Sequence, residues 1–175
     1  TSIVQRSCGK CRREFELDKP MNKNYTPINF PMLRYSDVLL MYSEAENEIN
    51  GPTEEAYDKI NQVRERGYGK LQPGASNPEE AHLSAGLSKD AFRQAIQDER
   101  ARELCFEGLR KGDLIRWGIF VDAMKQTAED FGAHAPASYA YAQTAAENVS
   151  AKHVLFPKPA LELSLNKLLK QNPGW

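Results

Sequence analysis

The chain has 175 residues, a formal net charge of −1 and 41% hydrophobic residues, a composition that suits one globular domain with a sizeable core. The near-zero charge and the lack of a basic tract give no electrostatic reason to expect nucleic acid or a membrane surface as a partner. No apolar run approaches the roughly 20 residues that a membrane-spanning helix needs.

The sequence starts at Thr1 rather than at Met, and its first residues show no charged segment followed by an apolar one. That pattern would mark a signal peptide. We therefore expect that any export signal or lipid-attachment cysteine has been removed or lies upstream of Thr1. The chain is accordingly expected to be a piece of a longer protein.

Three cysteines are present, and two of them, Cys8 and Cys11, form a C-x-x-C motif. Such a motif can be half of a zinc site, a redox pair or a local disulfide. A zinc site needs a second pair of ligands, but Cys105 and the three histidines stand alone in the sequence. No βαβ pattern supports a redox role. We expect a structural or incidental pair and no metal.

Residues 1–30 are expected to form an irregular lead-in, in which residues 10–17 ("KCRREFEL") resemble a strand. A first helix is expected over residues 34–50, because its apolar residues recur at helical spacing. Its inward face would consist of Val38, Tyr42, Ala45 and Ile49, with Tyr35 also in the core. Gly51 would end this helix in the αL conformation, which glycine adopts at low cost.

A second helix is expected over residues 52–67, with Pro52 and Thr53 at its start and Gly67 at its end. Its apolar face would consist of Ala56, Tyr57, Ile60 and Val63. Because the connection is so short, the two helices must pack antiparallel. From residue 34 to residue 67 the unit spans 34 residues, which is the period of a degenerate tetratricopeptide repeat.

After a polar loop, Ser88 is expected to cap a long helix that Gly108 interrupts. A further helix over residues 114–131 would complete a second hairpin, stacked on the first. Residues 31–131 would thus form helical hairpins. Residues 132–175 would form a loop, a short helix and a tail with a strand and a final helical turn.

The expected fold is therefore mainly α, with stacked tetratricopeptide-like helical hairpins, irregular loops and a short extended tail at the C-terminus. All of residues 1–175 would belong to a single domain.

Residues 97–118 contain ten charged side chains, yet they do not read as a solvated surface. On a helical wheel two carboxylates and a guanidinium share one stripe with apolar residues. The stripe consists of Phe92, Ile96, Glu99, Glu103, Phe106 and Arg110. We therefore expect some of these charged side chains to be buried and to have a role there.

One interpretation of these charges is catalysis, with Glu99 and Glu103 as acid and base. Two side chains on one helix point the same way, however, and could hardly flank a bond from opposite sides. Arg100, Arg102 and Arg110 would also keep both carboxylates ionised. A di-metal site would need Glu-x-x-His, and no histidine lies here.

The favoured interpretation is a buried ion network that orients neighbouring helices. Glutamates on one helix would accept bidentate bonds from arginines on other helices. The expected members are Arg64, Arg66, Glu99, Glu103, Glu107, Arg110 and Arg116. Removing one partner would leave an unpaired buried charge, at a cost of roughly 3–5 kcal/mol.

Four stretches, in this order, carry a resemblance to a known family: "FPMLRYSDVLLMYSEAENEING", "AYDKINQVRERG", "IQDERARELCFEGLRKGDLIRWG" and "LFPKPALELSLNKLLKQNPGW". Together they resemble the C-terminal half of the SusD/RagB family. The matching positions span about residues 30 to 175. The sequence departs from the family pattern at Lys158, which stands where isoleucine is usual, and at Trp175, which replaces a tyrosine.

The resemblance implies a scaffold of tetratricopeptide-like helix pairs, with no catalytic activity and no cofactor. It implies a nutrient-binding lipoprotein on the external face of the outer membrane, anchored through an N-terminal cysteine that this chain lacks. It also implies a TonB-dependent outer-membrane transporter as partner, and an oligosaccharide or a peptide as ligand. Family members are much longer, so the N-terminal portion is expected to be missing here.

Ligand contacts do not follow from the motifs. Sugar recognition needs exposed aromatic platforms beside hydrogen-bonding groups, and Tyr139 and Tyr141 alternate with alanines near His134. These two tyrosines are either ligand contacts or residues that pack a loop onto the body. A rival function for the whole chain is a helical-repeat scaffold that binds a protein or a peptide in its concave surface.

Overall fold

The structure of the chain is a computed structural model that describes residues 9–10, 12–74 and 78–175. The described residues divide into two compact units, residues 9–110 and residues 111–175. Helices dominate both units, and no strand occurs within the described ranges. The expected mainly α fold is therefore confirmed.

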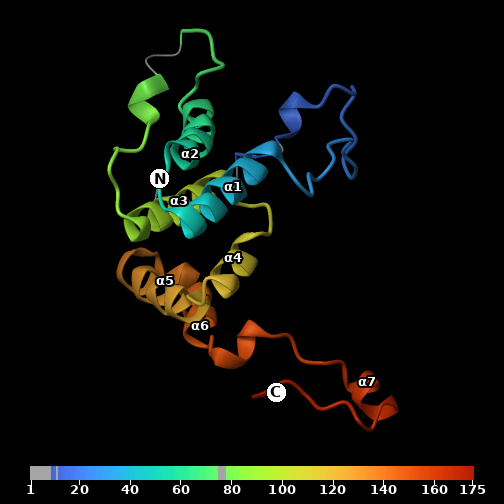
Figure 1. Cartoon of the computed structure of the whole chain (residues 1–175). Coiled ribbons are helices and arrows are strands. Elements are labelled where there is room, and N and C mark those ends of the chain that lie inside the picture. Colours follow the sequence, from blue (N-terminus) through green and yellow to red (C-terminus); the bar gives the residue numbers. More distant parts are fainter. Residues whose placement is uncertain (1–8, 11, 75–77) are drawn as a thin grey trace. The chain divides into compact units, whose positions relative to one another are not determined.

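Three helices that lie side by side build the first unit (Figure 1). They are α1 (Tyr35–Asn50), α2 (Glu54–Gly67) and α3 (Lys89–Glu103). Gly51 separates α1 from α2 with φ 85° and ψ −172°, so φ is positive as expected, while ψ is extended rather than αL. The hydroxyls of Thr53 and Ser88 cap α2 and α3 by accepting a backbone N–H, as the sequence predicts.

The core of this unit lies between the three helices. Phe92 and Ile96 of α3 are fully buried against Leu40 of α1 and Ile60 of α2. The ring of Tyr57 meets the ring of Phe92 edge to face, with centroids 4.6 Å apart. The rest of the buried cluster is Leu39, Ala56 and Val63, with Leu83 and Leu87 partly buried against it.

The inward face expected for α1 is wrong. Its predicted members Val38, Tyr42, Ala45 and Ile49, with Tyr35, are all exposed. The buried face carries polar residues instead: the Ser43 hydroxyl donates to the carbonyl of Ala56 at 2.8 Å, and the Asn47 amide donates to the carbonyl of Lys89 at 3.1 Å. These side chains can be buried because they hydrogen-bond to the backbone at α2 and α3.

The expected long helix from Ser88 is shorter than predicted. It ends at Glu103, and Phe106 adopts a positive φ of 63° before Gly108 at φ 80°. The chain therefore leaves the helical path, so Phe106 is 71% exposed instead of lying on the buried stripe. Glu107 likewise lies beyond the helix on which it was expected.

In the lead-in, the strand expected over residues 10–17 does not form in its described part. Arg13–Phe15 is a single turn of 3₁₀ helix, η2. The Arg13 guanidinium donates to the Glu16 carboxylate at 2.7 and 3.1 Å, and the Thr26 hydroxyl donates to it at 2.6 Å. The bond from Arg13 is the largest cause that lowers the pKa of Glu16 to about 2. These side-chain bonds to Glu16 thus hold residues 13–26 together as a loop.

The second unit is built on a hairpin of two helices (Figure 1). Its elements are α4 (Arg110–Arg116), which begins at the boundary, then α5 (Phe120–His134), α6 (Ala140–Glu147) and α7 (Ala160–Leu165), with short 3₁₀ helices η4 (Ala137–Tyr139) and η5 (Ala151–Val154). The helix expected over residues 114–131 is broken at Gly118, whose φ is 74°. The second hairpin is therefore α5 with α6.

The C-terminal tail, residues 153–175, has no strand, although the sequence predicted a short one there. Side chains of the last residues instead hold the tail. Gln171 accepts the N–H of Lys158 at 2.8 Å and donates to its carbonyl at 3.0 Å. The indole N–H of Trp175 donates to the carbonyl of Lys152 at 3.0 Å. These hydrogen bonds thus hold the last residues of the chain against residues that precede α7.

Candidate functional site

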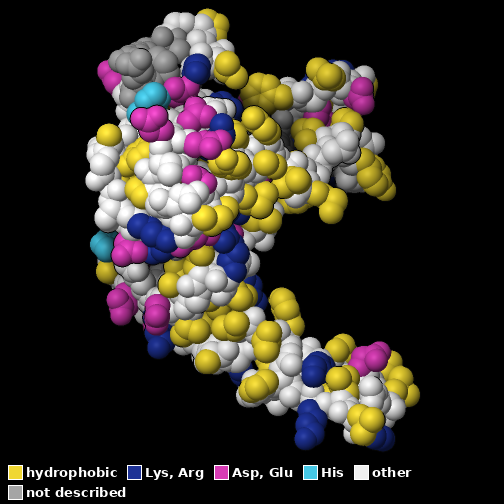
Figure 2. Space-filling model, in the orientation of Figure 1, with side chains coloured by type: hydrophobic (Ala, Val, Ile, Leu, Met, Phe, Trp, Pro, Cys, Tyr) yellow, Lys and Arg dark blue, Asp and Glu magenta, His cyan; other side chains and the backbone are white. Residues whose placement is uncertain are grey.

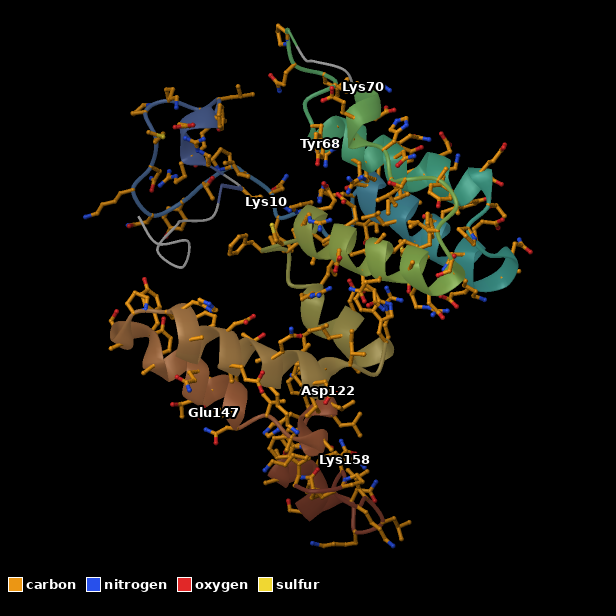
Figure 3. The ribbon with its side chains drawn as sticks, turned by 90° about the vertical axis from the view of Figure 1, so that its left-hand side faces the viewer. Lys10, Tyr68, Lys70, Asp122, Glu147 and Lys158 are labelled. Carbon is orange, nitrogen blue, oxygen red and sulfur yellow. The ribbon has the colours of Figure 1, made fainter. Side chains whose placement is uncertain are left out.

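A charged cluster lies where the C-terminal ends of α2 and α3 meet the N-terminal end of α1. Its members are Lys10, Arg34, Arg64, Arg66, Glu99, Arg102, Glu103 and Glu107. Figure 3 shows Lys10 near the end of α3, and Tyr68 and Lys70 just beyond α2. The cluster thus combines a residue of the lead-in with residues in or next to α1, α2 and α3.

Glu103 is the centre of the charged cluster, and its side chain is 10% exposed. One carboxylate oxygen, Oε1, accepts from the Arg34 guanidinium at 2.7 Å and from the Ser36 hydroxyl at 2.9 Å. The other, Oε2, accepts from Arg66 at 2.5 Å. This one carboxylate therefore ties α3 to the start of α1 and to the end of α2.

Glu107 forms a bidentate ion pair with Arg34. The guanidinium of Arg34 donates to both carboxylate oxygens, at 2.8 and 2.7 Å, and Lys10 pairs with the same group. The bond from Arg34 is the largest cause that lowers the pKa of Glu107, against the opposing effect of burial. A carboxylate held ionised in this way is a poor proton donor.

The depressed pKa of Glu107 predicts a pH dependence of stability. The pairing stabilises the fold above the ordinary glutamate pKa of 4.5, and this contribution is lost as the pH falls through the lower pKa of the folded state. Glu107→Gln should therefore be less stable than the parent chain at about pH 7, and the gap should narrow towards about pH 3. Urea unfolding of both proteins across that pH range measures the difference in their free energy of unfolding. A difference that does not change with pH would contradict the prediction.

A second pairing joins α2 to α3 one turn earlier. The Arg64 guanidinium donates to Glu99 at 2.8 Å, and Arg102 donates to the same carboxylate at 3.2 Å. Arg64 also donates to the carbonyl of Ala81 at 2.5 Å. The structure thus brings together four residues expected in the ion network, Arg64 with Glu99 and Arg66 with Glu103.

The two other expected arginines make contacts outside the charged cluster. Arg110 donates to the backbone carbonyl of Gln97 at 3.2 Å. Arg116 donates to the carboxylate of Asp113, within its own helix, at 2.9 Å. The first contact joins the start of α4 to α3, and the second stabilises a turn within α4.

The sequence did not single out Lys10, Arg34 or Asp37. Asp37 accepts from Arg100 at 2.8 Å, and these side chains are 9% and 5% exposed, which makes this the most deeply buried of the ion pairs described. A usable signal was present, because Asp37 directly precedes the apolar run "VLLM" of α1 and Arg34 lies three residues earlier. Charges at the edge of an otherwise apolar run indicate pairing.

Two adjoining grooves border the charged cluster. One, of about 420 Å³, lies between the start of α1 and the end of α2; the other, of about 400 Å³, lies between the lead-in and the end of α3. Both are lined by Arg34 and Arg66. Exposed aromatic rings of Tyr35, Phe30 and Phe106 also line them. Such surfaces suit the binding of a polar ligand better than proton transfer.

The tyrosines expected as ligand contacts lie in the second unit, where η4 passes into α6. The rings of Tyr139 and Tyr141 are 6.1 Å apart between centroids and tilted by 31°. Tyr139 is half-buried, and Tyr141 is 69% exposed. The side chain of Gln143 lies against Gly132 of α5 and donates to Glu147 at 2.9 Å. An exposed aromatic ring is thus available at this end of the hairpin.

Within the described ranges, no group of three or more histidine, cysteine or acidic side chains is placed to hold a metal ion. The C-x-x-C pair, Cys8 and Cys11, lies outside the described residues. Cys105 is a half-buried free thiol. Among the same described residues, none of the helices has the length and apolar character needed to cross a membrane.

The chain spans about a quarter of the length of the curated relatives it matches. SusD-like protein P25 of Formosa agariphila is 38% identical over 141 residues, which cover 81% of this chain and 23% of that protein. SusD-like protein P2 of the same organism is 33% identical over 156 residues, which cover 88% of this chain and 27% of that protein.

Solved structures show the same similarity. A SusD homologue from Bacteroides thetaiotaomicron superposes with a TM-score of 0.77 at 42% identity, covering 89% of this chain and 29% of that one. A SusD superfamily protein from Bacteroides vulgatus superposes with a TM-score of 0.57 at 29% identity, and the match covers 82% of this chain and 27% of that one. The SusD family itself matches residues 7–175. The expected resemblance is thereby confirmed, and the chain belongs to the SusD family.

Proposed function

We propose that this chain is part of a non-catalytic, cell-surface protein that binds a nutrient glycan for uptake. The observation that carries the proposal is the family match over residues 7–175, together with a 42% identical solved relative. The carboxylates of the charged cluster are paired with arginines, which supports a scaffold role for these acidic residues rather than acid–base chemistry.

The proposal extends to a setting for the whole protein. It is a lipoprotein on the external face of the outer membrane, attached through a cysteine upstream of this chain. Its partner is a TonB-dependent transporter, to which it delivers the captured ligand. Both points rest on the family to which the chain belongs.

We assign the glycan contact to Tyr139 and Tyr141. Sugar rings stack on exposed aromatic faces while neighbouring polar side chains bind their hydroxyls. The pair has this character, because one ring is 69% exposed and the rings are inclined by only 31° to each other. The alternative assignment is a third groove beside the charged cluster, of about 400 Å³, which is lined by Arg64, Glu99 and Tyr68. The Tyr68 side chain is 63% exposed there.

The test uses the full polypeptide that carries this chain, screened on an array of neutral and acidic oligosaccharides. The best ligand is then titrated calorimetrically into the parent protein and two variants. Tyr139→Ala/Tyr141→Ala should weaken binding by about tenfold or more, which corresponds to about 1.4 kcal/mol. Tyr68→Ala, an exposed tyrosine elsewhere, is the matched control and should leave affinity unchanged.

Other outcomes would overturn parts of the proposal. Loss of binding in Tyr68→Ala alone would place the ligand beside the charged cluster. Binding of peptides but of no glycan would favour the helical-repeat scaffold instead. An affinity pull-down from detergent-solubilised outer membranes tests the partner: a stoichiometric β-barrel transporter is expected, and enrichment of soluble proteins alone would argue against it.

A further inference from the structure

The groove between the lead-in and the end of α3, of about 400 Å³, is positively charged. Four cationic and two anionic side chains line it, which leaves a formal charge of +2. The cations are Lys10, Arg34, Arg66 and Arg102, and the carboxylates are those of Glu103 and Glu107. The chain as a whole has a net charge of −1, so the positive charge of this groove is local and would attract an anionic group.

The two most exposed cations of the groove can bind an anion directly. The side chains of Arg66 and Arg102 are 48% and 62% exposed, whereas the two carboxylates of the groove are nearly buried. Arg66 bonds to Glu103 through Nη2, and Arg102 bonds to Glu99 through Nη1. A guanidinium has five N–H donors in a planar fork that matches the oxygen atoms of an oxyanion. Both arginines therefore retain N–H donors for a ligand.

Phe106 lines the same groove in a backbone conformation that a bulky residue rarely adopts. Its φ is 63°, and within the described ranges it is the one residue other than glycine with a positive φ. Its ring is exposed, so packing within this part of the chain does not explain the strain. Strained backbone positions cluster at ligand-binding sites. The conformation of Phe106 thus indicates a role for its ring in the groove.

Aromatic and cationic side chains in one groove suit an acidic sugar. The C–H face of a sugar ring packs on an aromatic ring, while an arginine binds a carboxylate or a sulfate. Phe30 supplies a second exposed ring, and hydrophobic side chains lie at the surface of the lead-in that borders the groove (Figure 2). A neutral sugar would use these rings but not the excess charge, and an acidic peptide would use the charge but not the flat rings.

We propose that this groove binds the acidic group of a glycan, either a uronate carboxylate or a sulfate ester. Arg66 and Arg102 contact the anion, and Phe106 lies against the sugar ring. The inference rests on the proposed function, which makes the ligand a glycan, and it names the class of that glycan. The groove lies in the first unit, so this contact is additional to Tyr139 and Tyr141 of the second unit.

The test compares charged and neutral forms of the same saccharide on the full polypeptide that carries this chain. The probes are a galacturonate tetrasaccharide with its methyl ester, and a carrageenan tetrasaccharide with its desulfated form, each titrated calorimetrically. At least one charged saccharide should bind about tenfold more tightly than its neutral counterpart. This preference should shrink at about 1 M salt, because salt screens exposed charges.

Three variants assign that preference to residues. Arg102→Gln should remove most of it and leave the affinity for the neutral saccharide unchanged. Arg93→Gln, which removes the same charge near the start of α3, is the matched control and should change neither affinity. Phe106→Asn should weaken binding of both saccharides by about fivefold. Because asparagine adopts a positive φ more readily than phenylalanine, the urea midpoint of this variant should equal or exceed that of the parent.

Three results would overturn the inference. A lower urea midpoint for Phe106→Asn would mean that the ring packs against another part of the polypeptide. Equal affinities for the charged and neutral saccharides would mean that the excess charge has no role in binding. Inorganic sulfate or tetraglutamate bound as tightly as the charged saccharides would reduce the groove to a general anion site.

The same measurements judge the proposed function separately. Binding of neutral glycans alone, weakened by Tyr139→Ala/Tyr141→Ala, would support the proposed function while contradicting this inference. No binding of any saccharide would contradict both.

Discussion

Replacing Asp37 with alanine is expected to lower the free energy of unfolding of this chain by about 3–5 kcal/mol. The reason is that the Arg100 guanidinium, bonded to Asp37 at 2.8 Å, is only 5% exposed. Without the carboxylate, this buried guanidinium loses the ion pair that offsets the cost of removing it from water. Urea unfolding followed by circular dichroism at about pH 7 measures the loss.

Two matched variants separate this effect from a general sensitivity of the surface. Asp58→Ala removes a carboxylate that is 56% exposed and pairs with Lys59, and it should cost less than about 1 kcal/mol. Asp37→Leu combined with Arg100→Met removes both buried charges and should recover most of the stability lost in Asp37→Ala. An Asp37→Ala variant no less stable than Asp58→Ala would refute the buried-pair argument.

Phe92→Ala is expected to destabilise the chain by about 3–5 kcal/mol. Phe92 is fully buried among the three helices and meets the Tyr57 ring edge to face at 4.6 Å. Its removal forfeits burial of a large ring, and the surrounding side chains can collapse into the space only in part. The midpoint and slope of urea unfolding give the change in free energy directly.

Phe92→Leu is the control for the size of the cavity. Leucine keeps much of the volume, so its cost should stay at about 1–1.5 kcal/mol. Equal losses for alanine and leucine would mean that the edge-to-face contact with Tyr57, rather than the filled volume, stabilises this position. Both results are read against the same parent chain.

The sequence predicted some elements well because their signals are local. The hydroxyls of Thr53 and Ser88 cap the helices they were expected to begin, and α2 ends at Gly67. The apolar face of α2 at Ala56, Ile60 and Val63 is buried as expected. Capping bonds and helical periodicity involve residues only three or four positions apart, so they can be read without the fold.

The charged cluster was predicted only in part. Charges on an apolar stripe indicated that Glu99 and Glu103 would pair with arginines of neighbouring helices, and among the four candidates Arg64 and Arg66 do so. The bond from Arg34 to Glu107 joins residues 73 positions apart, and no local pattern specifies a contact at that distance. Which arginine reaches which carboxylate depends on how the helix ends meet.

The sequence by itself determined the helices α1 and α2 and which family the chain resembles, because short patterns of residues carry both signals. The tertiary structure decided which side of α1 is buried. Periodicity favours the side with more apolar residues, but the buried side contains Ser43 and Asn47, whose hydrogen bonds reach the backbone of Ala56 and Lys89. Those bonds offset the cost of burying polar groups, and they exist only once α2 and α3 are in place.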